Sequence, residues 1–142
     1  MKRFLTLVLM LFRKTRRTGY MLALSLVLGL LIGNLTLKPL IARVRPYDAN
    51  PDFVLLIDRL SDYSFPSGHT LASFEAAAVL LMQYRAKAVP ALVLALLIAF
   101  SRLYLYVHYP SDVLAGALLG VAFACIARAA VRRMTARSRI EL

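Results

Sequence analysis

Four long apolar segments dominate this chain of 142 residues, of which 61% are hydrophobic. They are residues 20–37, 69–84, 89–107 and 113–131. At about 1.5 Å per residue, helices of roughly 16 to 19 residues approach or reach the roughly 30 Å of a bilayer's hydrocarbon core. No alternation with a period of two residues runs through them, so they predict helices and not barrel strands. Because a soluble domain of this size could bury only part of so much apolar surface, the sequence predicts an all-α integral membrane bundle with four full transmembrane helices.

A shorter apolar segment, residues 4–12, precedes these four and lies between two basic pairs. It is too short to span a bilayer, and no small-residue cleavage site follows it as in a signal peptide. We expect a short N-terminal helix at the membrane interface, or the remnant of a longer helix. The whole chain, residues 1–142, is expected to form a single domain.

The basic residues give this topology an orientation in the cell membrane. In the four-span arrangement eleven of them fall on one side: Arg13, Lys14, Arg16, Arg17, Arg85, Lys87, Arg128, Arg132, Arg133, Arg137 and Arg139. An excess of Lys and Arg marks the cytoplasmic side. Although the net charge of +11 would also suit a nucleic-acid-binding protein, these residues lie in short runs between apolar segments. The bilayer is therefore the expected partner, and nucleic acid is not.

The connection over residues 39–68 is the one long loop of this topology, and it falls on the outer side. Residues 52–60 within it are expected to form a short amphipathic helix on the membrane surface. The loop also carries four carboxylates, Asp48, Asp52, Asp58 and Asp62. Carboxylates can bind Mg²⁺ or Ca²⁺, but the spacing is loose, so we expect them to solvate the loop and balance its arginines.

Two kinds of residue stand out inside the apolar segments. Two glycine pairs at four-residue spacing, Gly29/Gly33 and Gly116/Gly120, are typical of helices that pack closely. Glu75 lies two turns into segment 69–84, where a carboxyl group should be paired, protonated or near water. The sequence alone names no partner for it.

Three polar clusters fall on the outer side of the predicted topology. KPLIARVRP holds Lys38 and Arg45, FPSGHT holds Ser67, Gly68 and His69, and SRLYLYVHYPSD holds Arg102, His108 and Asp112. Each cluster alone has an ordinary explanation: snorkelling anchors, turn and cap residues, or a structural hydrogen bond. However, charged groups beside hydrocarbon indicate function by default, and both histidines of the chain fall on the same membrane face.

In this order the clusters resemble the signature of the type 2 phosphatidic acid phosphatase superfamily, membrane lipid phosphatases related in fold to the vanadium-dependent haloperoxidases. That signature reads Lys, six residues, Arg-Pro; then Pro-Ser-Gly-His; then Ser-Arg, five residues, His, three residues, Asp. Every spacing fits, and the resemblance covers about residues 13–131. Members typically have six spanning helices, so we expect helices that precede the first motif to be missing here. Whether the protein forms a homo-oligomer that compensates for the missing helices stays an open question.

The residues suit phosphate chemistry, in which charge neutralisation and positioning carry catalysis. Lys38, Arg45 and Arg102 supply cations for the non-bridging oxygens. Lys38 and Arg45 share a helix face if the helix continues through residue 45. Ser67 and Gly68 would complete a phosphate-binding cradle at a helix N-terminus, where unsatisfied backbone N–H groups favour an anion.

The histidines and the aspartate suit proton and phosphoryl transfer. His108 is the candidate nucleophile, and Asp112 can hold its other ring nitrogen. Pro110 is expected to break the helix between them. His69 is left to protonate the departing oxygen and later to activate water. The resemblance implies the same roles, with a phosphohistidine intermediate and with no metal or other cofactor.

The resemblance therefore implies a metal-independent lipid phosphatase or diphosphatase whose active site lies on the non-cytoplasmic side. A polyprenyl diphosphate, such as the undecaprenyl carrier of a bacterial envelope, is the favoured substrate. Phosphatidic acid and phosphatidylglycerol phosphate are close alternatives. Phosphate transfer to another lipid head group, and a shortened relative without catalysis, also stay open.

Overall fold

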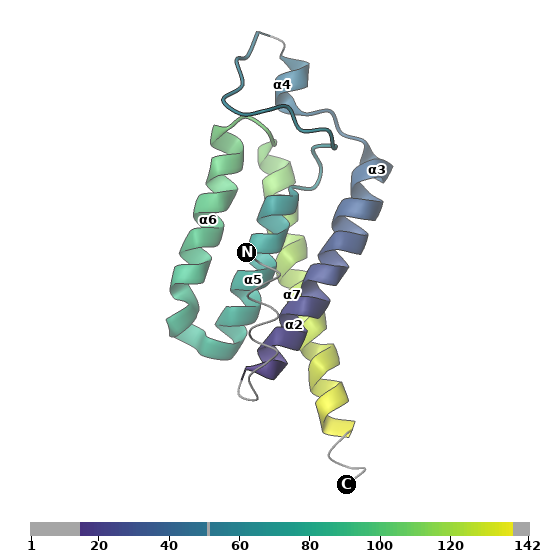
Figure 1. Cartoon of the computed structure of the whole chain (residues 1–142), viewed down its shortest axis with the longest axis vertical. Coiled ribbons are helices and arrows are strands. Elements are labelled where there is room, and N and C mark those ends of the chain that lie inside the picture. The colour runs from purple at the N-terminus through teal and green to yellow at the C-terminus, as the bar shows by residue number, and fades with distance from the viewer. Residues whose placement is uncertain (1–14, 51, 138–142) are drawn as a thin grey trace.

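The computed structural model describes residues 15–50 and 52–137, which form a bundle of helices with no strand among them (Figure 1). In chain order the elements are α2 (Arg16–Leu28), η1 (Gly29–Leu37), α3 (Lys38–Ile41), α4 (Pro46–Ala49), α5 (Gly68–Tyr84), η2 (Arg85–Ala88), α6 (Val89–Tyr104) and α7 (Pro110–Arg137). The predicted all-α class is confirmed. The predicted N-terminal segment 4–12 lies outside the described residues.

Three helical runs are long and apolar enough to cross a membrane: Arg16–Ala49, Gly68–Tyr104 and Pro110–Ala136. The middle run reverses direction at η2, where Arg85 has a left-handed backbone with φ 51°. As a result α5 and α6 lie antiparallel, side by side (Figure 1). These helices match the predicted segments 69–84 and 89–107. The chain is a multi-pass membrane protein, while the count of four spans stays a prediction.

The first run is a single rod in which α2, the π-helical η1 and α3 follow one another without a break. Its buried residues along α2 face the rest of the bundle: Thr18, Gly19, Met21, Leu22 and Ser25. The rod ends at Ile41 because Ala42 adopts a left-handed conformation with φ 47°. Lys38 and Arg45 were expected to share one helix face only if the helix continued through residue 45. It does not, because Arg45 is extended, as expected for a residue before proline.

Helix α5 is held between the two glycine pairs. A Cβ atom on Gly116 would lie 2.8 Å from the carbonyl oxygen of Ser67, and one on Gly120 would lie 2.6 Å from that of Leu71. On the other side, a Cβ atom on Gly29 would collide with the side chains of Leu71 and Glu75. The prediction that the glycines serve close helix packing is confirmed. Glu75 is fully buried in this contact.

The loop between α4 and α5 contains no helix over residues 52–60, so the predicted amphipathic helix is wrong. Helices of this length are marginal without packing, and other contacts fix the segment. The hydroxyl of the buried Tyr47 donates to the carbonyl of Leu60 and accepts from its N–H. Arg59 forms an ion pair with Asp48. The loop therefore folds back over one end of the bundle, which we call the site end.

Candidate active site

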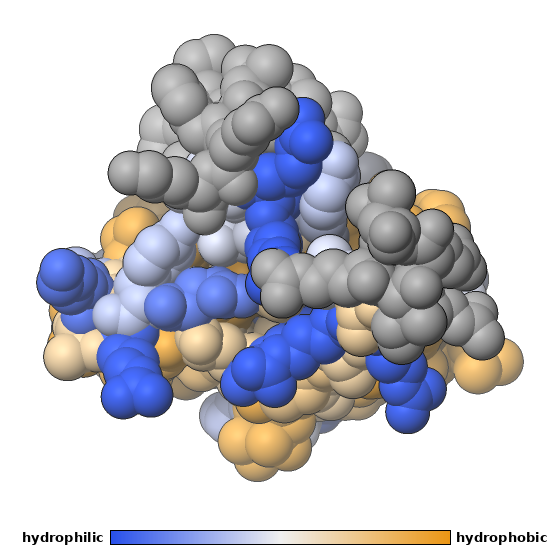
Figure 2. All heavy atoms as spheres, turned by 90° about the horizontal axis from the view of Figure 1, so that it is seen from below, coloured by the Kyte–Doolittle hydropathy of each residue, from blue (hydrophilic) through white to orange (hydrophobic). Residues whose placement is uncertain are grey.

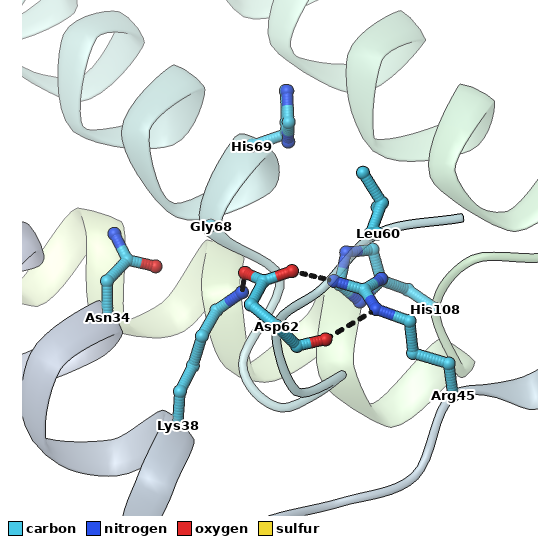
Figure 3. A pocket seen from close by; sticks show the side chains of 8 residues that line it. All are labelled: Asn34, Lys38, Arg45, Leu60, Asp62, Gly68, His69 and His108. Atoms are coloured by element: carbon cyan, nitrogen blue, oxygen red, sulfur yellow. Dashed lines mark hydrogen bonds and ion pairs between the residues drawn. The ribbon is translucent and has the colours of Figure 1, made fainter. Parts of the chain in front are cut away.

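A cavity of about 400 Å³ opens at the site end, below the loop that joins α4 to α5 (Figure 3). It is lined by Asn34, Lys38, Arg45, Leu60, Asp62, Gly68, His69 and His108. Five of these eight residues are predicted site residues from the three sequence clusters. The fold therefore brings members of all three clusters to one cavity.

Two buried cations meet in this cavity. Lys38, at the start of α3, is 6% exposed, and Arg45, just before α4, is 3% exposed. Both pair with the carboxylate of Asp62, Lys38 through Nζ and Arg45 through Nη2, which lies 2.5 Å from Oδ1. Although they are on different elements, the two cations thus converge on a single anion. This is the charge arrangement that a phosphate group requires.

Arg45 is fixed by further contacts that do not involve a carboxylate. Its Nε donates to the backbone carbonyl of Asp62 at 2.8 Å, and its Nη1 donates to that of Val107 at 2.8 Å. The guanidinium group is therefore positioned by the backbones of both segments that border the cavity.

Asp62 is the anion in the cradle, and its side chain is 53% exposed. Burial alone would raise its pKa, but the hydrogen bonds and charges of Lys38 and Arg45 outweigh that effect and lower the pKa below its ordinary value. The carboxylate is therefore ionised at neutral pH. The sequence prediction gave Asp62 only the task of balancing loop arginines. It does balance Arg45, and it also lies in the cavity.

His108 lies in the turn between α6 and α7, which Tyr106 opens with a left-handed backbone of φ 56°. Its Nδ1 is 3.7 Å from the Asp112 carboxylate and 3.4 Å from the hydroxyl of Ser64. Burial, followed by the nearby charge of Arg45, lowers the pKa of His108 to about 4. The imidazole that faces the cavity is therefore neutral at neutral pH.

Asp112 lies in the first turn of α7 and is fully buried. Its carboxylate accepts from Arg43 Nη1 at 2.7 Å, from the Tyr109 N–H at 2.9 Å and from the Ser64 hydroxyl. These donors hold the carboxylate beside Nδ1 of His108. The predicted helix boundary between His108 and Asp112 is confirmed, but the break precedes the proline: α6 ends at Tyr104, and α7 starts at Pro110 rather than at Ser111 or Asp112.

The first turn of α5 forms one wall of the cavity. Gly68 and His69 line it, and the Asn34 side chain from η1 lines it as well (Figure 3). A Cβ atom on Gly68 would lie 2.7 Å from Oδ1 of Asn34, so a larger residue here would require the Asn34 side chain to move. Ser67 is fully buried and its hydroxyl accepts from Thr70, so that hydroxyl is not part of the cavity lining.

Arg102 is the predicted cation that does not line the cavity. It lies in the last turn of α6, and its Nε and Nη2 both donate to the hydroxyl of Ser101 at 3.1 Å. The structure thus brings Lys38, Arg45, Gly68, His69 and His108 together, with Asp112 behind His108. Ser67 and Arg102 lie outside the lining.

Sequence reasoning missed four residues around this site. Arg43 and Ser64 hold Asp112, while Asn34 and Asp62 line the cavity. Arg43 is a third basic residue inside the first cluster, and its position there could have identified it as a site residue. Ser64, Asn34 and Asp62 have no pattern of their own. Among the described residues, no three His, Cys, Asp or Glu side chains are grouped so that they could hold a metal ion.

Several known proteins are similar to this chain in sequence. A model of the PAP2 superfamily matches residues 6–136. An undecaprenyl-diphosphatase of Sulfolobus acidocaldarius is 38% identical over 117 residues, which cover 81% of this chain and 56% of the relative. Phosphatidylglycerophosphatase B of Bacillus subtilis is 39% identical over 102 residues, which cover 62% of this chain and 46% of the relative. The chain spans about half the length of the curated relatives it matches.

Solved structures share the fold. The PAP2 type phosphatidylglycerolphosphate phosphatase from Bacillus subtilis superposes with a TM-score of 0.73 at 29% identity, covering 93% of this chain and 67% of that one. Aquifex aeolicus LpxE superposes with a TM-score of 0.74 at 31% identity, covering 87% and 73%. Three motif clusters at one cavity, a matching helical bundle and a family match over nearly the whole chain lead to one conclusion. The chain belongs to the PAP2 superfamily.

Proposed function

We propose that this protein is a metal-independent lipid phosphatase or diphosphatase that works through a phosphohistidine at His108. The observation that carries the proposal is the single cavity in which a neutral imidazole faces two buried cations, Lys38 and Arg45. The cations supply the charge that a metal ion would otherwise supply to the phosphate. A polyprenyl diphosphate is the first candidate substrate, since the relatives include an undecaprenyl-diphosphatase.

Substrate binding begins with an exchange of anions. The phosphate displaces the Asp62 carboxylate from Lys38 and Arg45, and the half-exposed side chain has room to rotate into solvent. Arg45 stays in place during this exchange because backbone carbonyls hold its Nε and Nη1. Gly68, at the N-terminus of α5, brings helix N-terminal donors to the phosphate. Arg102 completes the charge by giving up its contact with Ser101.

Phosphoryl transfer then takes place at His108. Because Nδ1 faces Asp112 and Ser64, Nε2 is the nitrogen that attacks phosphorus. The Nε2 lone pair forms the N–P bond while the bond from phosphorus to the leaving oxygen breaks, and His69 gives that oxygen a proton. The buried Asp112 stabilises the imidazolium that forms. In the second half, His69 takes a proton from water, the water oxygen bonds to phosphorus and the N–P bond breaks.

The site is proposed to face the non-cytoplasmic side. Arg128, Arg132 and Arg133 lie at the far end of α7 from Asp112, and Arg17 lies in the first turn of α2, which begins at that same far end (Figure 1). By the excess of positive charge, that far end is cytoplasmic. The lipid phosphate then comes from the outer leaflet.

A panel of lipid phosphates tests the proposal. The full chain in detergent should release phosphate from a polyprenyl diphosphate, from phosphatidic acid and from phosphatidylglycerol phosphate, fastest from the first. Release should continue in excess EDTA and should be inhibited by orthovanadate. Failure on every lipid would contradict the phosphatase, and loss in EDTA that Mg²⁺ restores would contradict metal independence. Using a lipid phosphate as the only substrate separates hydrolysis from transfer to another head group.

A further inference from the structure

A second cavity lies at the opposite end of the bundle, which we call the arginine end. Its volume is about 110 Å³, and it lies between α2, α5 and α7. Three arginines are among the residues that line it: Arg17, Arg128 and Arg132. Figure 2, which views the molecule from this end, shows hydrophilic residues gathered over the end face, with hydrophobic residues around them.

Helix periodicity explains why the three arginines meet. Arg128, Val131 and Arg132 lie on one face of α7, at positions i, i+3 and i+4. Arg17 and Met21 share a face of α2 in the same way. Met21 and Val131 are buried, at 2% and 5% exposure, and form an apolar floor. The cavity thus has a charged rim above an apolar base.

No anion balances this rim within residues 15–50 and 52–137. The six acidic residues there lie elsewhere: Asp48, Asp52, Asp58 and Asp62 in the loop region, Asp112 at the opposite end of α7, and Glu75 inside α5. No ion pair joins Arg17, Arg128 or Arg132 to any of them. Like charges that line one cavity repel each other, so an anion beyond these described residues would stabilise the arrangement.

Size and position limit what this anion can be. A liquid water molecule occupies about 30 Å³, so the cavity holds a group of a few heavy atoms, such as a phosphate, and not a whole lipid. Forked guanidinium groups bind phosphate oxygens in pairs. The cavity lies where long apolar helices end, the depth of lipid head groups, and basic pockets between membrane helices bind such groups.

We propose that the arginine cavity binds the phosphate of an anionic phospholipid in the leaflet on that side of the membrane. The phosphate lies among Arg17, Arg128 and Arg132, and the glycerol end of the acyl chains contacts Met21 and Met82. This lipid is bound and not hydrolysed, since the histidines lie at the other end of the bundle. Free phosphate carries the same kind of charge but has no apolar part that could contact Met21 and Met82.

Lipid binding to the detergent-purified full chain, measured by native mass spectrometry, tests this inference. Phosphatidylglycerol is the anionic probe, phosphatidylcholine the zwitterionic probe and inorganic phosphate the headgroup alone. The variant Arg128→Gln/Arg132→Gln removes two cations from the cavity. The matched control Lys87→Gln/Arg133→Gln removes the same charge from exposed positions at the same end, outside the cavity.

Phosphatidylglycerol should bind the wild type in preference to phosphatidylcholine. Its affinity should fall at least about tenfold in the cavity variant and stay within about twofold in the control. Equal losses in both variants would reduce the effect to net charge and overturn the site. Displacement of phosphatidylglycerol by equimolar inorganic phosphate would overturn the lipid as the ligand. None of these results depends on hydrolysis, so the experiment tests lipid binding at the arginine cavity independently of the proposed phosphatase activity.

Discussion

The two ends of the bundle both concentrate basic side chains, but within residues 15–50 and 52–137 acidic partners pair with them at only one end. At the site end, Lys38 and Arg45 pair with Asp62, and Arg43 pairs with Asp112. At the arginine end, no acidic side chain of the described residues meets the guanidinium groups that line the cavity. The two ends therefore differ in whether acidic side chains pair with the cations, and not in how many cations they hold.

The difference matches what each end is proposed to do. A catalytic cradle must take up a phosphate and release it in every cycle, and a resident carboxylate that can re-enter weakens the binding of substrate and product alike. A lipid-binding cavity needs no such exchange. Uniformly tight binding would not raise a turnover rate, because only interactions specific to the transition state do. Asp62 is thus the group whose removal should make the site end resemble the arginine end.

The largest effect should follow from the substitution His108→Ala. Because His108 is the proposed nucleophile, removing its imidazole should abolish turnover and covalent labelling by radioactive phosphate for every substrate. The double variant Lys87→Gln/Arg133→Gln, at the arginine end, is the control and should keep both. Labelling that survives in His108→Ala would place the nucleophile elsewhere.

The substitution His69→Ala should have an effect that depends on the leaving group. General acid–base assistance is worth about 10²–10⁴-fold, so lipid phosphates should react slower by that order. An aryl phosphate, whose phenolate leaves without an acid, should still phosphorylate His108. The phosphoenzyme should then persist, because His69 is also the proposed base for water.

The measurement for His69→Ala is a rapid burst of phenolate close to one per active site, followed by slow release. A burst in His108→Ala and none in His69→Ala would reverse the two assignments. The same loss for aryl and lipid substrates would remove the acid role of His69.

The substitution Asp62→Asn sharpens the comparison of the two ends directly. Removing the resident carboxylate should lower the inhibition constant of inorganic phosphate about tenfold, because Lys38 and Arg45 no longer have an internal partner. Asp58→Asn is the matched control in the same loop, with an exposed side chain outside the cavity, and should change it less than twofold. Weaker phosphate inhibition in Asp62→Asn would instead identify Asp62 as a fixed clamp for the two cations.

The smallest effect concerns the His108 imidazole, which should not become protonated between neutral pH and about pH 5. Because the pKa of His108 is lowered to about 4, the ring is neutral above that pH and loses its nucleophilic lone pair only below it. Nitrogen NMR of the ring should therefore report neutral imidazole from neutral pH down to about pH 5. In Arg45→Gln the loss of the nearby charge should move the midpoint upward. A wild-type midpoint near the ordinary value of 6.5 would contradict this environment.

Much of the fold could be predicted because a segment that crosses a lipid bilayer as a helix must be a long apolar run, which is easy to recognise in a sequence. Each of the four long apolar segments contains a helix or the main part of one, since apolar runs of this length in a chain so hydrophobic have few alternatives. The predicted helix at 52–60 failed because its amphipathic pattern competes with a tertiary contact, the Tyr47 hydroxyl on Leu60. Periodicity contains no information about such a contact.

The site was predictable in its motifs and not in its partners. Lys38, Arg45, His69 and His108 stand in recognisable spacings, and the fold brings them to one cavity. Arg43, Ser64 and Asp62 act through contacts between segments far apart in the chain. Arg102 shows the reverse case: its spacing fits, yet in this structure its guanidinium group contacts Ser101. Spacing identifies a residue but does not determine its rotamer.

Helix α6 gives the surrounding membrane a direct mechanical connection to the chemistry. It buries only Ala95 and Ala99, exposes Leu94, Leu97 and Phe100, and runs straight into the turn that carries His108. With 16 residues at about 1.5 Å each, it is shorter than the roughly 30 Å hydrocarbon layer it would cross. Such hydrophobic mismatch is relieved by thinning the bilayer or by shifting the helix. We therefore expect the thickness of the host membrane to affect the position of the imidazole that is proposed as the nucleophile.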